Sequence, residues 1–268
     1  IIENYHKILT NEIILIIECC RLSQDSKLIE EKISLIKNWD DFISLSYSHG
    51  VFPLVYQVLK KHEDKIPLNT FAFMKQTYMN LVKTNMLMTS ELIKVSKLLE
   101  ENGIKAIAFK GPVLSAMAYG DVISRQYVDL DLLVNENEIE NVAFILESNK
   151  YTTLNSSKLL KNKKYLETDK DFSFFTPINN IHIEMHWRLF KKNILIENFY
   201  SDKNEIMINN NSISTFSFDF LFVYLCLHGS THVWERIEWI VDINRLLELN
   251  YDIDWNKLLE ISEKMDCK

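Results

Sequence analysis

Glycine and proline are scarce in this sequence, with five glycines and four prolines among 268 residues. Both residue types interrupt helices, so their scarcity favours long helices and few tight turns. The first hundred residues contain clear breaks only at Gly50, Pro53 and Pro67. We therefore expect the N-terminal third to be all helical.

Cysteine is also sparse, and its four positions (Cys19, Cys20, Cys226 and Cys267) contain no Cys-x-x-Cys spacing. This pattern predicts neither a disulfide framework nor a zinc finger, but buried free thiols in a reducing, cytoplasmic compartment. Apolar runs are short: Ile13–Cys20 is interrupted by Glu18 and is far shorter than a membrane span. No basic leader or cleavage site precedes it, so we expect no membrane association.

Positive charge is in deficit, with a net charge of −7 and a pI near 5.6. Extended binding to nucleic acid normally needs a basic face, so nucleic acid is a poor candidate partner. Hydrophobic residues make up 47% of the chain, which is enough to fill the core of one large or two small domains. The chain opens without methionine and stops within a helix-like segment, and the sequence does not decide whether it is a fragment of a longer protein.

The hydrophobic periodicity divides the chain into three parts. Apolar residues recur at helical spacing over 68–100, which predicts one amphipathic helix or a kinked pair ended by Asn102-Gly103. Short β-rich runs follow at 104–109, 127–134, 172–176 and 181–187, with a helix over 136–148. Helical spacing returns over 218–228, over 233–249 and from Leu258 onward, after the polar turn 209–211. The predicted class is α+β, with helical regions at 1–102 and 209–268 around a mixed-sheet core at 103–208.

Two carboxylates interrupt the most apolar of these runs. Asp129 and Asp131 are spaced i, i+2 and therefore share one face of a strand, roughly 6.6 Å apart, while Val128, Leu130 and Leu132 occupy the other. Such a pair repels unless a cation lies between the charges, and Mg²⁺ is commonly held by one or two carboxylates together with substrate phosphates. The alternative is a solvated edge of an amphipathic strand.

A second alternating segment offers a third carboxylate. His182, Glu184 and His186 share one face of the 181–187 run, while Ile181, Ile183 and Met185 occupy the opposite face. If this strand lies beside the aspartate strand, Glu184 completes a cluster that can hold two metal ions and accept a proton from an attacking hydroxyl.

Cationic and backbone groups suited to phosphate precede the aspartates. Lys110 and Gly111 end an apolar run, and Pro112 suits the first turn of a following helix, whose N-terminus can receive phosphate oxygens. A solvated lysine at an ordinary strand-to-helix turn is the alternative. Arg125 can clamp a triphosphate or form a surface pair with Asp121, and on the residue pattern alone we favour the surface pair.

Two other patterns predict packing more than chemistry. His228 and His232 are four residues apart and, with His182 and His186, offer four imidazoles, but the metalloprotease glutamate is missing, which disfavours zinc. His228 is expected near the cleft or hydrogen-bonded in the core. A helical stripe of apolar side chains near the C-terminus is expected to be core instead of a base-stacking platform: Trp234, Trp239, Ile240, Ile243 and Leu246.

Taken in order, these motifs resemble the uncharacterised bacterial nucleotidyltransferases of the DNA polymerase beta-like superfamily. The resemblance covers nearly the whole chain, through Tyr47–Leu54, Phe109-Lys110-Gly111, Tyr119-Gly120-Asp121, Arg125, Asp129–Val134, Glu184–Arg188, His228, Trp239 and Asp242.

The resemblance implies a Mg²⁺-dependent nucleotidyltransferase core with two metal ions, Mn²⁺ being a substitute. Asp129, Asp131 and Glu184 would be the metal ligands, and Glu184 the base. The superfamily usually has Gly-Ser after the first strand, but here Pro112 follows Gly111. Lys110, Arg125 and Ser115, the last a turn further along, are therefore the expected triphosphate ligands together with Gly111.

The expected reaction moves a nucleoside monophosphate, AMP from ATP, to a hydroxyl of a small molecule or protein. One alternative is a catalytically silent nucleotide-binding or antitoxin-like protein of the same fold, suggested by the altered Gly-Pro turn. Another is a metal hydrolase that uses water as the acceptor. The sequence names neither the acceptor nor the oligomeric state.

Overall fold

The computed structural model describes residues 9–190, 203–249 and 252–267. The N-terminal part is helical, as predicted. Its elements are α2 (Asn11–Cys20), α3 (Ser26–Ser34), α4 (Trp39–Ser48), α5 (Phe52–Leu59), a 3-10 helix (Lys60–Lys65) and α6 (Leu68–Glu101). The side chains of Thr10, Asp25 and Asn38 accept hydrogen bonds from backbone N–H groups and so fix the starts of α2, α3 and α4.

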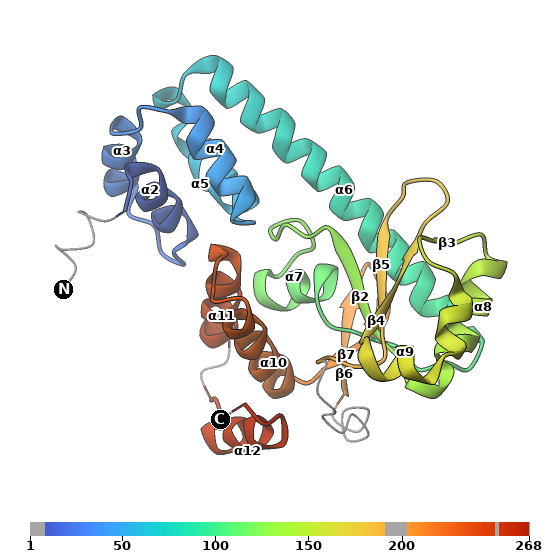
Figure 1. Ribbon diagram of the computed structural model, residues 1–268. Coiled ribbons are helices and arrows are strands. Elements are labelled where there is room, and N and C mark those ends of the chain that lie inside the picture. The colour runs from blue at the N-terminus through green and yellow to red at the C-terminus, as the bar shows by residue number, and fades with distance from the viewer. Residues whose placement is uncertain (1–8, 191–202, 250–251, 268) are drawn as a thin grey trace.

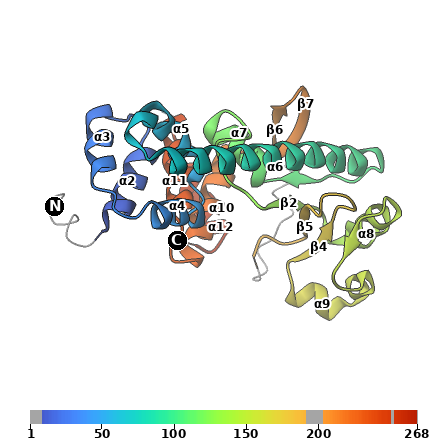
Figure 2. The same ribbon diagram turned by 90° about the horizontal axis from the view of Figure 1, so that it is seen from above.

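Helix α6 is a single element of 34 residues, which decides between the one-helix and kinked-pair alternatives. At 1.5 Å per residue it is about 50 Å long, and it runs from the N-terminal helices at one end of the molecule to the sheet at the other (Figures 1 and 2). Its first half packs Met74 among the N-terminal helices, and its second half packs Met88, Leu92 and Val95 against the sheet. The helix therefore joins two separate hydrophobic cores.

The sheet has five strands, namely β1 (Ile107–Ala108), β2 (Asp129–Leu133), β3 (Thr152–Thr153), β4 (Asp171–Phe175) and β5 (His182–His186). Their order is β1-β2-β5-β4-β3, with β2 and β5 parallel and the other pairs antiparallel. The predicted α+β class with a mixed sheet is thus confirmed. The predicted strands 172–176 and 181–187 lie within a residue of β4 and β5, whereas β2 starts two residues later than predicted and β1 is shorter than predicted.

The connection between the parallel strands contains the 3-10 helix Glu136–Glu138, α8 (Ile139–Ser148), the 3-10 helix Ser157–Lys161 and α9 (Lys163–Thr168). The apolar face of the sheet is closed by fully buried Leu130, Leu132, Ile183 and Met185. Val128 was predicted to share this face, but it precedes β2 and is 69% exposed. Strand β2 therefore begins two residues later than the sequence suggested.

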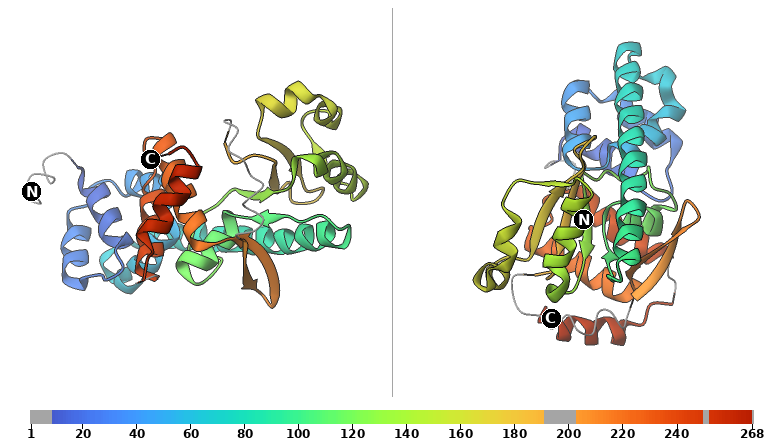
Figure 3. Two further views of the ribbon diagram at one scale, coloured as in Figure 1. Left: turned by 90° about the horizontal axis from the view of Figure 1, so that it is seen from below. Right: turned by 90° about the vertical axis from the view of Figure 1, so that its right-hand side faces the viewer.

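A hairpin that the periodicity did not reveal follows the sheet. Strands β6 (Lys203–Ile208) and β7 (Asn211–Phe216) pair antiparallel around Asn209 and Asn210, which both have positive φ. Two such central residues are typical of the two-residue hairpin turns that match strand twist, and asparagine tolerates this conformation. In both views of Figure 3, from below and from the side, the hairpin projects away from the sheet.

Three helices follow in the described part of the chain: α10 (Phe218–Thr231), α11 (Ile237–Leu249) and α12 (Trp255–Lys264). The predicted 233–249 helix begins only at Ile237, because Val233 and Trp234 have positive φ. The prediction of a core stripe was wrong for Trp234 and Ile240, which are 36% and 52% exposed, whereas Leu246 is buried. Trp234 folds back over α10, where a Cβ at Gly229 would overlap the indole ring.

The proposed region boundaries stay a prediction. The first falls in the turn after α6, and the second lies at the tip of the β6–β7 hairpin. Within the described ranges, no helix is both long and apolar enough to cross a membrane.

Candidate active site

The parallel pairing of β2 with β5 brings the predicted carboxylates together. The register sets Asp129 opposite His182, Asp131 opposite Glu184 and Leu133 opposite His186. Because alternate side chains share a face, all the polar residues of both strands point to the side opposite the apolar core. The adjacency on which the three-carboxylate cluster depended is therefore present.

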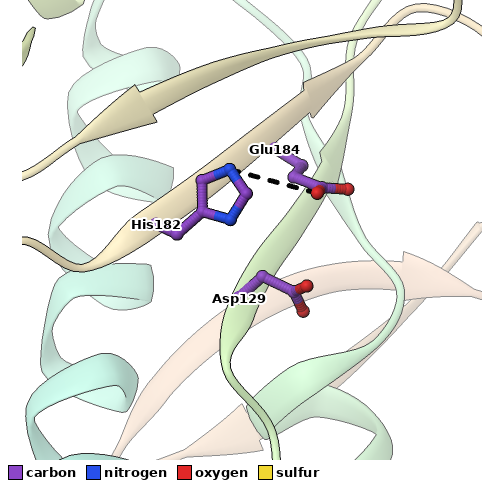
Figure 4. A group of neighbouring side chains, drawn as sticks. All are labelled: Asp129, His182 and Glu184. Atoms are coloured by element: carbon purple, nitrogen blue, oxygen red, sulfur yellow. Dashed lines mark ion pairs between the residues drawn. The ribbon is translucent and has the colours of Figure 1, made fainter. Parts of the chain in front are cut away.

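Ligating atoms converge in two overlapping groups on this face. Asp129, His182 and Glu184 form one group, and Asp131, Glu184 and His186 form the other, each with atoms within 4.8 Å of one another. Figure 4 shows His182, Asp129 and Glu184 gathered on the same side of the two strands. Glu184 belongs to both groups, so it links them.

Lys110 neutralises the buried end of the cluster. Its Nζ lies 2.8 Å from Asp131 Oδ1, and the Asp131 side chain is fully buried. Burial by itself lowers the pKa of Lys110, but Asp131 outweighs it and raises the pKa above its ordinary value, so the ammonium stays charged. The predicted phosphate ligand is thus at the site, engaged with a carboxylate.

His186 is the second partner of Asp131 at this end. Its Nε2 lies 3.1 Å from Asp131 Oδ1 and 3.4 Å from Glu184 Oε2. Burial disfavours the imidazolium, but the hydrogen bonds to Asp131 and Glu184 prevail and raise the pKa of His186. Asp131 Oδ2 and His186 Nδ1 are buried and have no hydrogen-bond partner within the described part of the chain.

The carboxyl groups differ in charge compensation. Burial raises the pKa of Asp129, and repulsion by Asp131 raises it further. Burial acts in the same direction on Asp131, but Lys110 outweighs it and holds the pKa of this carboxyl well below its usual range. The hydrogen bond with His186 lowers the pKa of Glu184. Asp129 is therefore the carboxylate whose charge the protein compensates least.

Gly111 allows the helix start to approach the aspartate strand. Its φ is +54°, and a Cβ would lie 3.1 Å from the Asp129 carbonyl oxygen. Lys110 directly precedes α7 (Gly111–Tyr119), with Pro112 in its first turn as predicted. Both the backbone conformation and the space at this position therefore require glycine.

Replacing Gly111 with alanine is expected to lower the free energy of unfolding by about 1–3 kcal/mol. Urea denaturation would measure the change. Gly103→Ala is the matched control, because Gly103 has φ +77° but nothing within 4 Å of its Cβ position. Equal losses in the two variants would mean that the close approach to Asp129 contributes nothing.

On the residue pattern alone Arg125 was expected to pair with Asp121, and this was wrong; its role as a triphosphate ligand stays a prediction. Its side chain is buried, with Nε 3.1 Å from both carboxylate oxygens of Asp242 and Nη2 3.1 Å from Oδ2. Asp121 instead accepts hydrogen bonds from the backbone of Ile123 and Ser124. Arg125 lines one wall of a cavity in the cleft, but its guanidinium is paired with Asp242, which lies 117 residues away in the sequence.

A cavity of about 270 Å³ opens beside Asp129. It is lined by Lys110, by the segment that leads into β2, and by α10, α11 and the turn between these two helices. The lining side chains include Lys110, Arg125, Asp129, His228, His232, Arg236, Glu238 and Trp239. Ser115 is fully buried in α7 and does not line this cavity, so its predicted role as a phosphate ligand stays a prediction. A cavity of about 600 Å³ between α6 and the hairpin contains none of the predicted site residues.

Histidine and tryptophan rings form one wall of the cavity. His228 lies with its ring centroid 5.3 Å from that of Trp239 and 4.8 Å from that of His232. Burial and the nearby Lys110 lower the pKa of His228 to about 3, so the imidazole is neutral. The expectation that His228 lies near the cleft is confirmed, and Trp239 lines the cleft instead of filling the core. Neither His228 nor His232 belongs to a three-ligand group within the described residues.

Glu238 is a site residue that the sequence pattern did not single out. It is buried, its Oε1 lies 3.1 Å from Arg236 Nη2, and its Oε2 packs where a Cβ at Gly50 would overlap it. Gly50 (φ +72°) belongs to the 47–54 motif. Gly50 was the one sign of this contact in the sequence, because a glycine there lets the Glu238 side chain approach the N-terminal helices.

Glu238 is expected to make stability depend on pH. Burial raises its pKa to about 7 from an ordinary 4.5, although Arg125 and Arg236 oppose the shift and Asp242 adds to it. The folded state therefore binds more protons than the unfolded state between these values, so stability falls as pH rises from about 4.5 to 7 and then levels off.

Glu238→Gln removes this titration. Relative to the unmodified chain, it is expected to gain up to about 3 kcal/mol of unfolding free energy between pH 4.5 and pH 8, measured by urea denaturation. Glu248→Gln, an exposed change on the same helix, is the control. A Glu238→Gln difference that is the same at both pH values would contradict the shift.

A mixed sheet with two carboxylates on one strand and a third on its parallel neighbour defines a nucleotidyltransferase core of the DNA polymerase beta-like type. The chain belongs to the family described as uncharacterised nucleotidyltransferases, whose sequence model matches residues 37–268. The resemblance inferred from the motifs is therefore confirmed, and the protein is an enzyme of this class.

Known structures offer more distant similarity, at 12% identity in each case. The solution structure of the antibiotic-resistance factor ANT(2'')-Ia aligns with a TM-score of 0.48 over 68% of this chain and 92% of that chain. The crystal structure of ANT(2'')-Ia with adenylyl-2''-tobramycin gives 0.47 over 66% and 97%. An antigenic nucleotidyltransferase-like protein from Paracoccidioides brasiliensis gives 0.45 over 66% and 86%. No curated protein matches the chain.

Proposed function

We propose that this enzyme transfers a nucleoside monophosphate, AMP from ATP, to a hydroxyl of a small molecule or protein. The observation that carries the proposal is the register that sets Asp131 opposite Glu184, beside Lys110 and the start of α7. The acidic groups and the proposed phosphate ligands then face the same cleft, as transfer from a metal-bound triphosphate requires. The free thiols of all four cysteines agree with the proposed cytoplasmic location.

Asp129, Asp131 and Glu184 would hold the divalent cations, two Mg²⁺ ions for which Mn²⁺ can substitute. The donor set suits such ions because it is rich in carboxylate oxygen and because the buried Asp131 Oδ2 has no hydrogen-bond partner among the described residues. When bound, the cations would neutralise negative charge on the phosphate oxygens and on the leaving pyrophosphate.

The protein's own groups would position the reactants. Lys110, the backbone at Gly111 and the cavity-lining Arg125 would bind phosphate oxygens. The acceptor oxygen would attack the α-phosphorus, form the new O–P bond and break the bond to pyrophosphate. Glu184, held ionised by His186, would take the hydroxyl proton.

The test uses the whole chain with each labelled nucleoside triphosphate, Mg²⁺ and a panel of sugars, aminoglycosides and Ser-, Thr- or Tyr-containing peptides. Pyrophosphate release together with a labelled adduct, lost in Asp129→Asn, would support the proposal. Tight nucleotide binding without turnover across the panel would instead support a silent binding protein. Nucleotide hydrolysis without an adduct would identify a hydrolase.

A further inference from the structure

The two groups of ligating side chains differ in how far neighbouring protein groups already neutralise the negative charge of their carboxylates. The inner position, formed by Asp131, Glu184 and His186, contains the Lys110 ammonium 2.8 Å from Asp131 and the His186 ring between the two carboxylates. The outer position, formed by Asp129, His182 and Glu184, has no lysine or arginine within ion-pair distance among the described residues. The carboxylates therefore stabilise an added cation most at the outer position.

Asp129 supports this distinction. Its carboxylate makes no hydrogen bond or ion pair with any described residue, although it lines the cavity beside Lys110 and is only partly exposed. A partly buried carboxylate without a partner is costly unless a ligand satisfies it. The outer position thus combines free ligand atoms with access from the cleft.

His182 is held in place for a role at this position. Its Nε2 lies 2.9 Å from Ser173 Oγ on β4 and 4.0 Å from Glu184 Oε1, and its ring stacks on Phe175 with centroids 4.9 Å apart. The other ring nitrogen has no hydrogen-bond partner among the described residues. Histidines that bind metals commonly use one nitrogen for the metal and the other for a neighbouring group that fixes the ring. Figure 4 shows the ring beside both carboxylates of the outer position.

We propose that His182 is a metal ligand and that the outer position prefers a first-row transition ion such as Mn²⁺ to Mg²⁺. Imidazole nitrogen suits such ions, whereas Mg²⁺ prefers oxygen ligands. The inference rests on the proposed function to the extent that both place a divalent cation on Asp129 and Glu184. It adds a nitrogen ligand and a metal preference to that site.

The test measures metal binding by the whole chain, independently of turnover. Mn²⁺ affinity would be measured from the electron paramagnetic resonance signal of the free ion, and electron spin echo modulation would detect nitrogen bound to Mn²⁺. We expect nitrogen modulation in the unmodified chain. In His182→Gln the modulation should vanish and Mn²⁺ affinity should fall at least about tenfold, while Mg²⁺ affinity, measured by calorimetry, should change less than about twofold.

Two variants separate ligation from folding effects. His228→Gln changes an imidazole of the same cavity that lies outside both groups, and should retain the modulation. His186→Gln should retain it too, because His186 belongs only to the inner position. Modulation that persists in His182→Gln, or Mn²⁺ binding without any nitrogen modulation, would overturn the inference but leave the proposed transfer standing. Failure to bind either cation, with or without ATP, would overturn both.

Discussion

Asp131→Asn is expected to reduce nucleotide transfer by about 10²- to 10⁴-fold. A bound cation supplies several kcal/mol of stabilisation to the charge that develops in phosphoryl transfer, and each 1.36 kcal/mol is a factor of ten in rate. Asp131 is the one proposed metal ligand with a fully buried side chain, and it also accepts from Lys110 and His186. Asparagine keeps the shape but loses the negative charge that Lys110 and a bound cation require. Steady-state kinetics with saturating ATP and Mg²⁺ would measure the loss in kcat.

Asp254→Asn provides the control for this experiment. Asp254 is exposed and caps the start of α12, a position where asparagine serves equally well. Its kcat should equal that of the unmodified chain. If Asp131→Asn retains full activity and the native unfolding transition, the proposed metal site is incorrect.

Asp242→Asn is expected to cost about 3–5 kcal/mol of stability, the range found when one partner of a buried ion pair is removed. Arg125 is almost completely buried, and its ion-pair contacts among the described residues, at 3.1 Å, go to the Asp242 carboxylate, with Glu238 adding a longer-range attraction. Asparagine can still accept the 2.7 Å hydrogen bond from Tyr119, so the loss would be that of the charge. Urea denaturation at neutral pH would measure it.

The double change Arg125→Met and Asp242→Leu distinguishes charge from packing. Replacing both ions with apolar groups of similar size is often neutral for stability, so the double variant should recover most of the loss. A double variant as unstable as Asp242→Asn would show that the pair's hydrogen bonds, and not an uncompensated charge, account for the effect.

The periodicity of the sequence was sufficient to predict which side chains share a face on each of the two central strands. A period of two places Asp129 with Asp131, and His182 with Glu184 and His186, whatever the rest of the fold does. It could not show that the strands are neighbours, because pairing depends on the path of the connection between them. The resemblance to a family supplied what the spacing lacked.

The partners of the buried cations could not be predicted in the same way. Arg125 has an acid four residues before it at Asp121, yet its partner is Asp242, on a helix that only the folded chain brings near. Burial decides the choice, since a surface pair contributes little and a buried guanidinium must be compensated. Likewise, Gly50 could signal that another group approaches the backbone there, but not that this group is Glu238, which lies far away in the sequence.

The parallel register of β2 and β5 separates two kinds of sequence change. Between Leu133 and His182 the chain passes through α8, β3, α9 and β4 before it returns, so an insertion in the loops there leaves the spatial relation of Asp131 to Glu184 unchanged. A single-residue deletion at the start of β5 would instead change the parity of the strand. Ile183 and Met185 would then face the cleft while Glu184 turned into the core. Related chains can therefore differ widely in the sequence distance between these carboxylates, but only changes that preserve the odd-even phase of the strand keep the site.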